Sequence, residues 1–150
     1  MHQKLKPYLT NIHNLDSIQA AVDRFLREYE PDRVDKRVGY VSGIISSDGP
    51  EHIAQNTERL ARYAHYLRSL HDFPIFAYTD IFTDQIYGRV GAERLSSDEW
   101  LIFWRKILNL GHVTDIFMTP RWDVSLGAQD EYKTAQELGL RIHIVADQGF

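Results

Sequence analysis

The sequence predicts an α/β fold, a small doubly wound sandwich whose mainly parallel sheet has about four to five strands. Two observations support this class. Apolar segments of strand length recur along the chain, and segments with helical periodicity separate them; the strand candidates are residues 38–45, 73–79, 113–119 and 140–146. Strands that alternate with helices are joined by right-handed crossovers, which gives a parallel sheet covered by helices on both faces. With 150 residues the chain has the size of one such domain.

An extra helix is expected ahead of the sheet. Apolar side chains recur at helical spacing from Leu15 to Tyr29, and Pro31 marks the end of the pattern. We therefore divide the chain into an N-terminal helical extension, residues 1–36, and a main α/β domain, residues 37–150. The apolar stripe of the extension must pack on the main domain or on a partner subunit.

Three helices are expected between the strands. The first covers about residues 50–70. The second starts at Ser96, which forms a capping box with Glu99, and the third covers residues 127–138 and stops at Gly139. This succession of elements is typical of a flavodoxin-like arrangement.

The segment 80–95 follows the second strand and fits no regular element throughout. Loops longer than about 12 residues in compact domains are usually functional or disordered. Because this one is rich in aromatic and apolar residues, we expect an ordered lid at the carboxyl end of the strand. Its first residue, Asp80, offers a carboxylate there.

Composition argues against several classes of function. The net charge is −4, from 17 basic and 21 acidic residues, and no basic stripe interleaves with aromatic residues, so nucleic-acid binding is not expected. No apolar run approaches the roughly 20 residues that span a bilayer, and the amino terminus lacks the apolar core of a signal peptide. We therefore expect a cytoplasmic protein without a membrane partner. The chain has no cysteine and its 7 histidines lack metal-ligand spacing, so no metal site is expected.

A polar loop follows the third strand, at the strand end where open α/β sheets bind ligands. It contains Trp122, Asp123, Ser125 and Gly127, and a helix starts near Gly127. The free amides of a helix start favour an anion, so a phosphate could be held by these amides and the Ser125 hydroxyl. Glu131 would lie one turn inside the helix as a nucleophile or base. Acidic residues in a first helical turn also suit the helix dipole of any protein, which is the competing explanation.

The loop after the first strand should meet this one at the same rim of the sheet. It supplies Ser42, Gly43 and Ser46, which suit close approach to a phosphate or ribose. The segment matches neither the dinucleotide fingerprint nor the Walker loop. An ordinary glycine-containing turn would give the same pattern.

The chain resembles the nucleoside 2-deoxyribosyltransferase-like superfamily over about residues 37 to 147. The matching residues occur in the family's order: Tyr40-Val41-Ser42-Gly43, Asn56, Asp115, Trp122, Ser125-Leu126-Gly127 and Glu131. Enzymes of this family break or exchange the N-glycosidic bond of nucleosides or nucleotides. The resemblance implies that Glu131 is the nucleophile at the anomeric carbon and that Tyr40 positions it. It also implies a homodimer or higher homo-oligomer, because the family tends to build its pockets at subunit interfaces.

The residue six positions before this glutamate distinguishes branches of the family. It is an aspartate in the nucleoside transferases and a serine in the branch that hydrolyses nucleoside 5′-monophosphates, and here it is Ser125. A serine hydroxyl donates to a phosphate without adding like charge. The chain therefore looks more like the monophosphate N-glycosidases. A looser set of uncharacterised relatives shares W-x-x-S-x-G-A, matched from Trp122 to Ala128, which implies the fold without an assured activity.

One family feature is missing. Active members carry an aspartate for the leaving base on the helix before the third strand. Other residues stand at that place here: Trp104, Arg105 and Lys106. Carboxylates that could replace it come from the long loop and the helix start: Asp80, Asp84 and Asp98. Without a proton donor, departure of the base would lose about 10²- to 10⁴-fold in rate.

These residues lead to one expected function and two alternatives. We expect hydrolysis or transfer at the N-glycosidic bond of a nucleotide or nucleoside, with Glu131 as nucleophile and no cofactor. The first alternative is a catalytically inactive nucleotide-binding module that uses the same pocket. The second is a structural or interaction domain of the same fold, assembled through its N-terminal helix.

Overall fold

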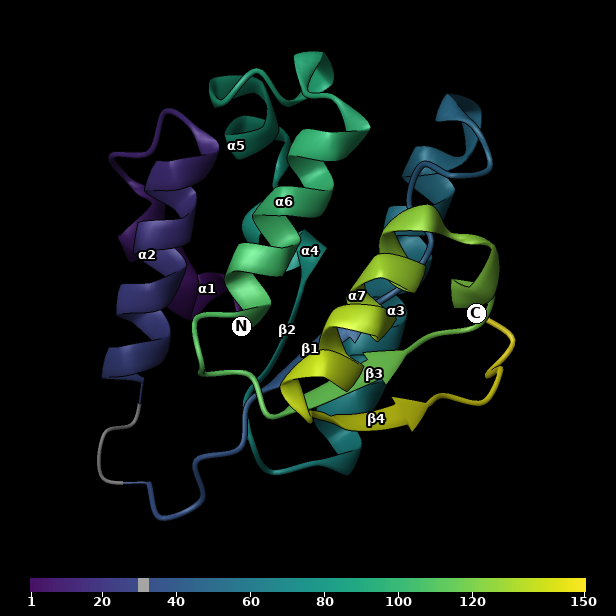
Figure 1. Cartoon of the computed structure of the whole chain (residues 1–150). Helices are drawn as coiled ribbons and strands as arrows, with labels where there is room; N and C mark the ends of the chain where they lie inside the picture. Colours follow the sequence, from purple (N-terminus) through teal and green to yellow (C-terminus); the bar gives the residue numbers. More distant parts are fainter. Residues whose placement is uncertain (30–32) are drawn as a thin grey trace.

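The computed structural model describes residues 1–29 and 33–150, and in this part of the chain it shows one parallel four-stranded sheet (Figure 1). The strands are β1 (Gly39–Ser42), β2 (Ile75–Ala77), β3 (Asp115–Met118) and β4 (Arg141–Ile144), in the order β2-β1-β3-β4. This order confirms the doubly wound, flavodoxin-like class. The chain changes direction across the sheet between β1 and β3, so the carboxyl ends of these two strands mark the topological switch point, where open α/β sheets bind ligands.

The strands β1, β2 and β3 are buried along their whole length, which explains why they read as continuous apolar runs in the sequence. The register places Tyr40 between Phe76 and Ile116. Because side chains alternate along a strand, Tyr40 and Ser42 of β1 project from the same face of the sheet. The edge strand β4 is half exposed.

Helices cover both faces of the sheet. The helices α6 (Ser97–Leu108) and α7 (Leu126–Leu138) lie on one face and α3 (Ile53–Leu70) lies on the other (Figure 1). The predicted capping box is confirmed, since the Ser96 hydroxyl accepts from the Glu99 amide at 3.2 Å. Gly139 ends α7 with a φ of 68°, a left-handed conformation that glycine adopts without strain.

The N-terminal extension packs on the main domain of the same chain. It consists of α1 (His2–Leu5), a 3-10 turn η1 (Lys6–Leu9) and α2 (Leu15–Glu28), and α2 lies beside α6 (Figure 1). The inner side of α2 is buried in a core that continues to the sheet. The predicted helix end at Pro31 lies outside the described residues.

The segment after β2 is more regular than expected. In place of a loop without regular structure it holds α4 (Tyr78–Ile81), α5 (Asp84–Arg89) and a 3-10 turn η3 (Ala92–Arg94). The helix α5 is too short for a clear apolar periodicity, but the Thr83 hydroxyl caps it by accepting from the Ile86 amide at 3.3 Å. Two further 3-10 turns, η2 (Pro50–His52) and η4 (Trp122–Val124), precede α3 and α7.

Candidate functional site at the switch point

Glu131 is held by two hydroxyl groups from β1. Tyr40 donates its phenolic hydrogen bond to Oε1 at 2.9 Å, and Ser42 donates to Oε2 at 2.7 Å. The arrangement follows from the local structure, because Tyr40 and Ser42 share one face of β1 and α7 packs its second turn on that face. The exposed fractions are 7% for Glu131, 2% for Tyr40 and 1% for Ser42. The carboxylate is therefore fixed in a nearly water-free place.

Burial decides the acidity of this carboxyl group. Removal from water raises the pKa of Glu131 to about 7, and the hydrogen bonds from Ser42 and Tyr40 oppose this rise only in part. The neighbouring charge of Asp130 adds to the increase. Burial also raises the pKa of Tyr40 well above its usual range. Near neutral pH, Glu131 exists in both protonation states while Tyr40 keeps its proton.

The helix that faces α7 contributes an ion pair next to this site. Arg105 of α6 donates to both oxygens of Asp130, from Nε at 2.8 Å and from Nη2 at 2.5 Å. A guanidinium and a carboxylate form such a bidentate pair when their planes are aligned. Arg105 occupies the part of the helix where the sequence lacks the expected aspartate.

Side chains of the two switch-point loops connect them to each other. Thr119 donates through Oγ1 to the Ser42 carbonyl at 2.8 Å, and the Ser47 hydroxyl accepts from the Leu126 amide at 3.1 Å. Gly43 is required by this contact, because a Cβ at that position would lie 2.3 Å from Oγ1 of Thr119. The close approach of the loops, and not a ligand, explains this glycine.

Among the described residues, no close contact of this kind explains Gly127. Its φ lies outside the left-handed region, and an added Cβ would meet only Oγ of Ser125, at 4.0 Å. Ser125 caps the helix, since its hydroxyl accepts from the Ala128 amide at 3.2 Å. Its own hydroxyl proton is left for another acceptor. The start of α7 thus combines the hydroxyl of Ser125, a residue that is 3% exposed, with a backbone that has open space beside Gly127.

Three further predicted site residues lie in the loops at the switch point. Ser46 is exposed in the loop after β1, and Asp123 is exposed in the loop after β3. Trp122 stacks on the ring of Tyr132, with centroids 4.6 Å apart. The Asp123 carbonyl accepts from the side chain of Gln129, which ties the loop to α7.

Asp80 has partners of its own. It pairs with Arg68 of α3 and accepts from the Ala77 amide at 2.8 Å, and it is 5% exposed. These contacts join α4 to β2 and α3. The structure therefore brings Tyr40, Ser42 and Glu131 together, whereas Asp80 is engaged in a separate ion pair.

Several side-chain contacts at the switch point could not be predicted from the sequence. Asp48 accepts from Asn56 at 2.8 Å and pairs with Arg121 at 3.3 Å, so one carboxylate joins α3 to both loops. Arg121 adopts a φ of 69°, which is uncommon for a residue other than glycine. The dipeptides around these residues give no signal for such pairing, because the partners are far apart in the chain.

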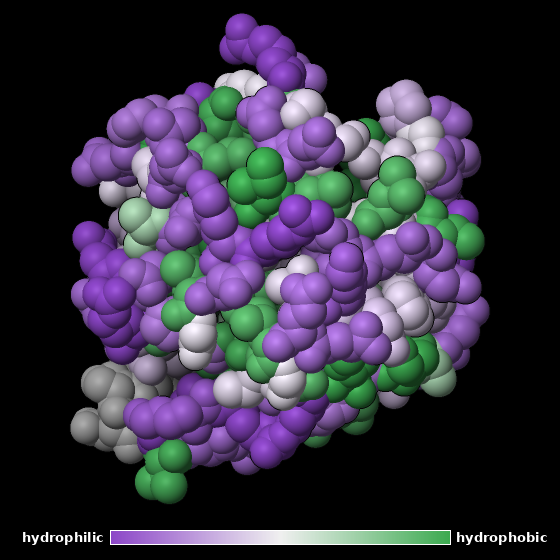
Figure 2. Space-filling model, viewed as in Figure 1, coloured by the Kyte–Doolittle hydropathy of each residue, from purple (hydrophilic) through white to green (hydrophobic). Residues whose placement is uncertain are grey.

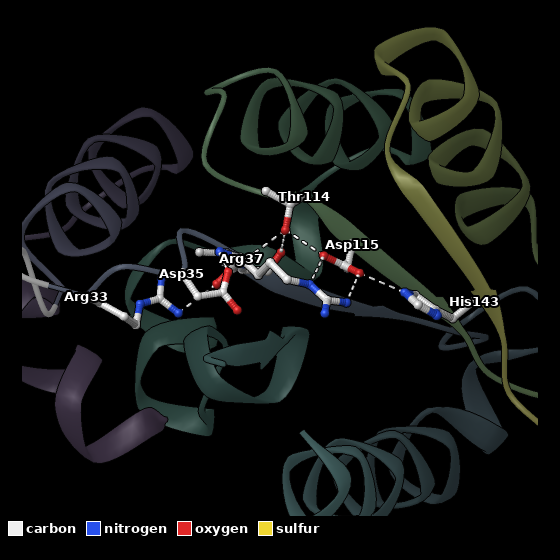
Figure 3. A network of polar contacts seen from close by, with 7 residues as sticks. Arg33, Asp35, Arg37, Thr114, Asp115 and His143 are labelled. Atoms are coloured by element: carbon white, nitrogen blue, oxygen red, sulfur yellow. Dashed lines mark hydrogen bonds and ion pairs between the residues drawn. The ribbon is translucent and has the colours of Figure 1, made fainter. Parts of the chain in front are cut away.

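Asp115 lies at the opposite, amino-terminal end of β3 (Figure 3). It is fully buried and accepts from Arg37 at 2.7 and 3.2 Å, from Thr114 at 2.6 Å and from His143 at 2.8 Å. Burial would raise the pKa of Asp115, but the hydrogen bonds from Arg37, Thr114 and His143 hold it well below its usual range. This network joins β3 to β4 and to the segment before β1, and it explains His143 as a structural residue.

The surface seen in Figure 2 is mostly hydrophilic, with hydrophobic residues showing between the helices. Within residues 1–29 and 33–150, no three histidine, aspartate or glutamate side chains are arranged to hold a metal ion. In the same described part of the chain, no helix is long and apolar enough to cross a membrane. Comparison with protein-family models, with curated proteins and with solved structures finds no match to this chain.

Proposed function

We propose that the protein cleaves or exchanges the N-glycosidic bond of a nucleotide or nucleoside, with Glu131 as nucleophile. The observation that supports this most is the pairing of both Glu131 oxygens with Tyr40 and Ser42 beneath the switch point. A buried carboxylate with a raised pKa at a ligand-binding edge is a recognised sign of a functional site. The resemblance in the order of these residues points to glycosyl transfer.

The proposed reaction uses Glu131 in its ionised form. An oxygen of the carboxylate attacks the anomeric carbon, the bond to the base breaks, and water or a second base then resolves the ester. A carboxylate has about four lone-pair sites, so the bonds from Tyr40 and Ser42 leave about two of them, one on each oxygen, for attack. These two bonds also fix the plane of the carboxylate, which favours a near-attack geometry.

The substrate that fits best is a nucleoside 5′-monophosphate. We place its phosphate at the start of α7, where Ser125 can donate and Gly127 leaves space. Ser46 and Asp123 would contact the sugar from the loop tips, and Trp122 would flank it. Asp80 would contact the substrate only if its ion pair with Arg68 opens.

A homo-oligomer is part of the proposal. Val124 and Leu126 flank Ser125 and have exposed fractions of 56% and 69%. Exposed apolar side chains beside a site are the kind of surface that a second copy would cover.

A panel of nucleoside monophosphates and the matching nucleosides tests the proposal. We expect the protein to release free base from monophosphates, which chromatography measures. Glu131→Ala should abolish this release, while nucleotide binding persists. Removing a carboxylate near a phosphate should if anything tighten binding. Base release that survives Glu131→Ala would refute Glu131 as nucleophile.

One observation favours a second candidate, a nucleotide-binding module without activity. The hydroxyls of Tyr40 and Ser42 satisfy Glu131 inside the core, as they would for a purely structural carboxyl group. That candidate predicts nucleotide binding without base release in the unmodified protein, so the same panel separates the two.

A further inference from the structure

Among the residues that the structure describes, the two side chains that donate to the Glu131 carboxylate are Tyr40 and Ser42, and neither has a proton to give to a leaving group. Tyr40 and Ser42 direct their hydroxyl protons at Glu131 itself. Tyr40 is also too weak an acid, because burial raises its pKa well above the usual range. Tyr40 is 2% exposed, so its hydroxyl is also shielded from solvent.

The nearest carboxylate is also engaged. Asp130 directly precedes Glu131 in the chain, and both its oxygens accept from the Arg105 guanidinium at 2.5 and 2.8 Å. A carboxylate in a bidentate pair with arginine is an acceptor in its charged form. Asp80 is engaged through one oxygen, since its Oδ2 accepts from both Arg68 and the Ala77 amide. Asp84 and Asp98 lie exposed in the first turns of α5 and α6, and Asp123 lies exposed in the loop after β3. In the described part of the chain, no hydrogen bond or ion pair holds any of these three carboxylates beside Glu131.

We propose that this site selects glycosyl donors whose leaving group departs as a stable anion. The inference rests on the proposed function and narrows its substrate class. Donors of a uracil type, whose ring N–H is acidic, belong to this class. Donors of an adenine type do not, because adenine leaves readily only after it gains a proton.

The chemical step balances without an acid from the protein. An oxygen of ionised Glu131 forms a bond to the anomeric carbon, and the bond from that carbon to the base nitrogen breaks. The bonding electron pair stays on the base, which leaves as an anion and takes a proton from water. Water then attacks the anomeric carbon of the ester, Glu131 departs as a carboxylate, and the excess proton passes to solvent.

Three donors on the unmodified protein test this selection: 5-fluorouridine, uridine and adenosine 5′-monophosphates. The first two form a matched pair, because fluorine stabilises the anion of the base and changes its size little. We expect kcat/KM for base release to be about tenfold higher for the fluorinated donor than for the uridine donor. The adenosine donor should be slower than the fluorinated donor by about 10²- to 10⁴-fold, the usual contribution of a general acid.

The outcomes separate this inference from the proposed function. Equal rates for the three donors, or a faster adenosine donor, would overturn the selection and leave Glu131 catalysis standing. Release from none of the three would overturn the proposed function and the selection with it. Asp130→Asn gives a second readout, since the ratio between the fluorinated and adenosine donors should not change. A ratio that grows in this variant would identify Asp130 as an acid and refute the inference.

Discussion

Oγ of Ser42 lies 2.7 Å from Oε2 of Glu131, although 89 positions separate the two residues in the chain. This bond joins β1 to α7 across the switch point, and it reaches a carboxylate that is 7% exposed. A hydroxyl that donates to the charged form lowers the pKa of an acid. The bond therefore favours the ionised state that a nucleophile needs.

The first prediction concerns this bond. Ser42→Ala should raise the pKa of Glu131 above about 7, because the charged form loses a donor. If ionised Glu131 attacks the sugar, the acid limb of the kcat/KM profile should move to higher pH, and Tyr40→Phe should act in the same direction. Ser47→Ala is the matched control, since the Ser47 hydroxyl serves the Leu126 amide. An acid limb that stays in place in Ser42→Ala would contradict the assignment.

The second prediction is a pH-dependent stability. The pKa of Glu131 rises from an ordinary 4.5 to about 7 in the folded protein, so between these values the folded state holds more protons than the unfolded state. The free energy of unfolding therefore falls as pH rises through this window, by about 3 kcal/mol in total. Glutamine does not ionise, so the Glu131→Gln variant does not lose this stability. Its free energy of unfolding should equal that of the unmodified protein near pH 4 and exceed it at pH 8.

Urea unfolding at several pH values measures this difference, and Glu137→Gln is the control because Glu137 is exposed on the same helix. Parallel stability curves for Glu131→Gln and the unmodified protein would show that Glu131 is not a destabilising buried charge.

The third prediction separates folding from binding at Gly127. Gly127→Ala should stabilise the protein by about 0.5 to 1 kcal/mol, because alanine is the better helix residue and its Cβ meets open space. If a phosphate approaches the backbone there, the same change should weaken monophosphate binding at least about tenfold, or 1.4 kcal/mol. Gly88→Ala, a helical glycine in α5 with open space around it, should stabilise without affecting binding. Unchanged nucleotide affinity in Gly127→Ala would show that the phosphate does not bind beside Gly127.

The fourth prediction concerns the choice between nucleotide and nucleoside. Ser125→Asp should keep the fold, because aspartate caps helices as well as serine does. It should reverse the preference for monophosphates over nucleosides, since the new charge repels a phosphate. Calorimetric titration with both ligands measures the ratio of affinities. Equal affinity for nucleoside and nucleotide in the unmodified protein would rule out phosphate recognition by Ser125.

The sequence was sufficient for the sheet and for the elements that carry the site. Strand-length apolar runs and helical periodicity respond to burial, so the predicted bounds of β3 and α7 agree with the structure within two residues, whereas β1 ends three residues before its predicted end. The sequence predicts Glu131 and Tyr40 as site residues from two features: the polar loop at the carboxyl end of a strand, and the order of the residues that resemble the family. The short helices α4 and α5 were missed, since segments of this length have no resolvable period.

The partners of the charged residues could not be predicted. The pair of Arg105 with Asp130 joins two helices whose relative rotation is set by packing, and the pair of Arg68 with Asp80 depends on the turn after β2. The position of Asp80 after a strand predicts a substrate residue, yet its carboxylate is engaged in that ion pair. Side-chain pairing over long separations follows from tertiary packing, which local patterns do not encode.

The most direct test of Glu131 as nucleophile is to trap the ester. Fluorine at the 2′ carbon slows both steps, because both pass through oxocarbenium-like transition states. A 2′-fluoro analogue of 5-fluorouridine monophosphate should therefore accumulate the ester, since its better leaving group keeps the first step faster than the second. Intact-protein mass spectrometry should show the added sugar phosphate, peptide mapping should place it on Glu131, and Glu131→Gln should remain unmodified. A label on another residue, or turnover of the unmodified substrate by Glu131→Gln, would contradict the account.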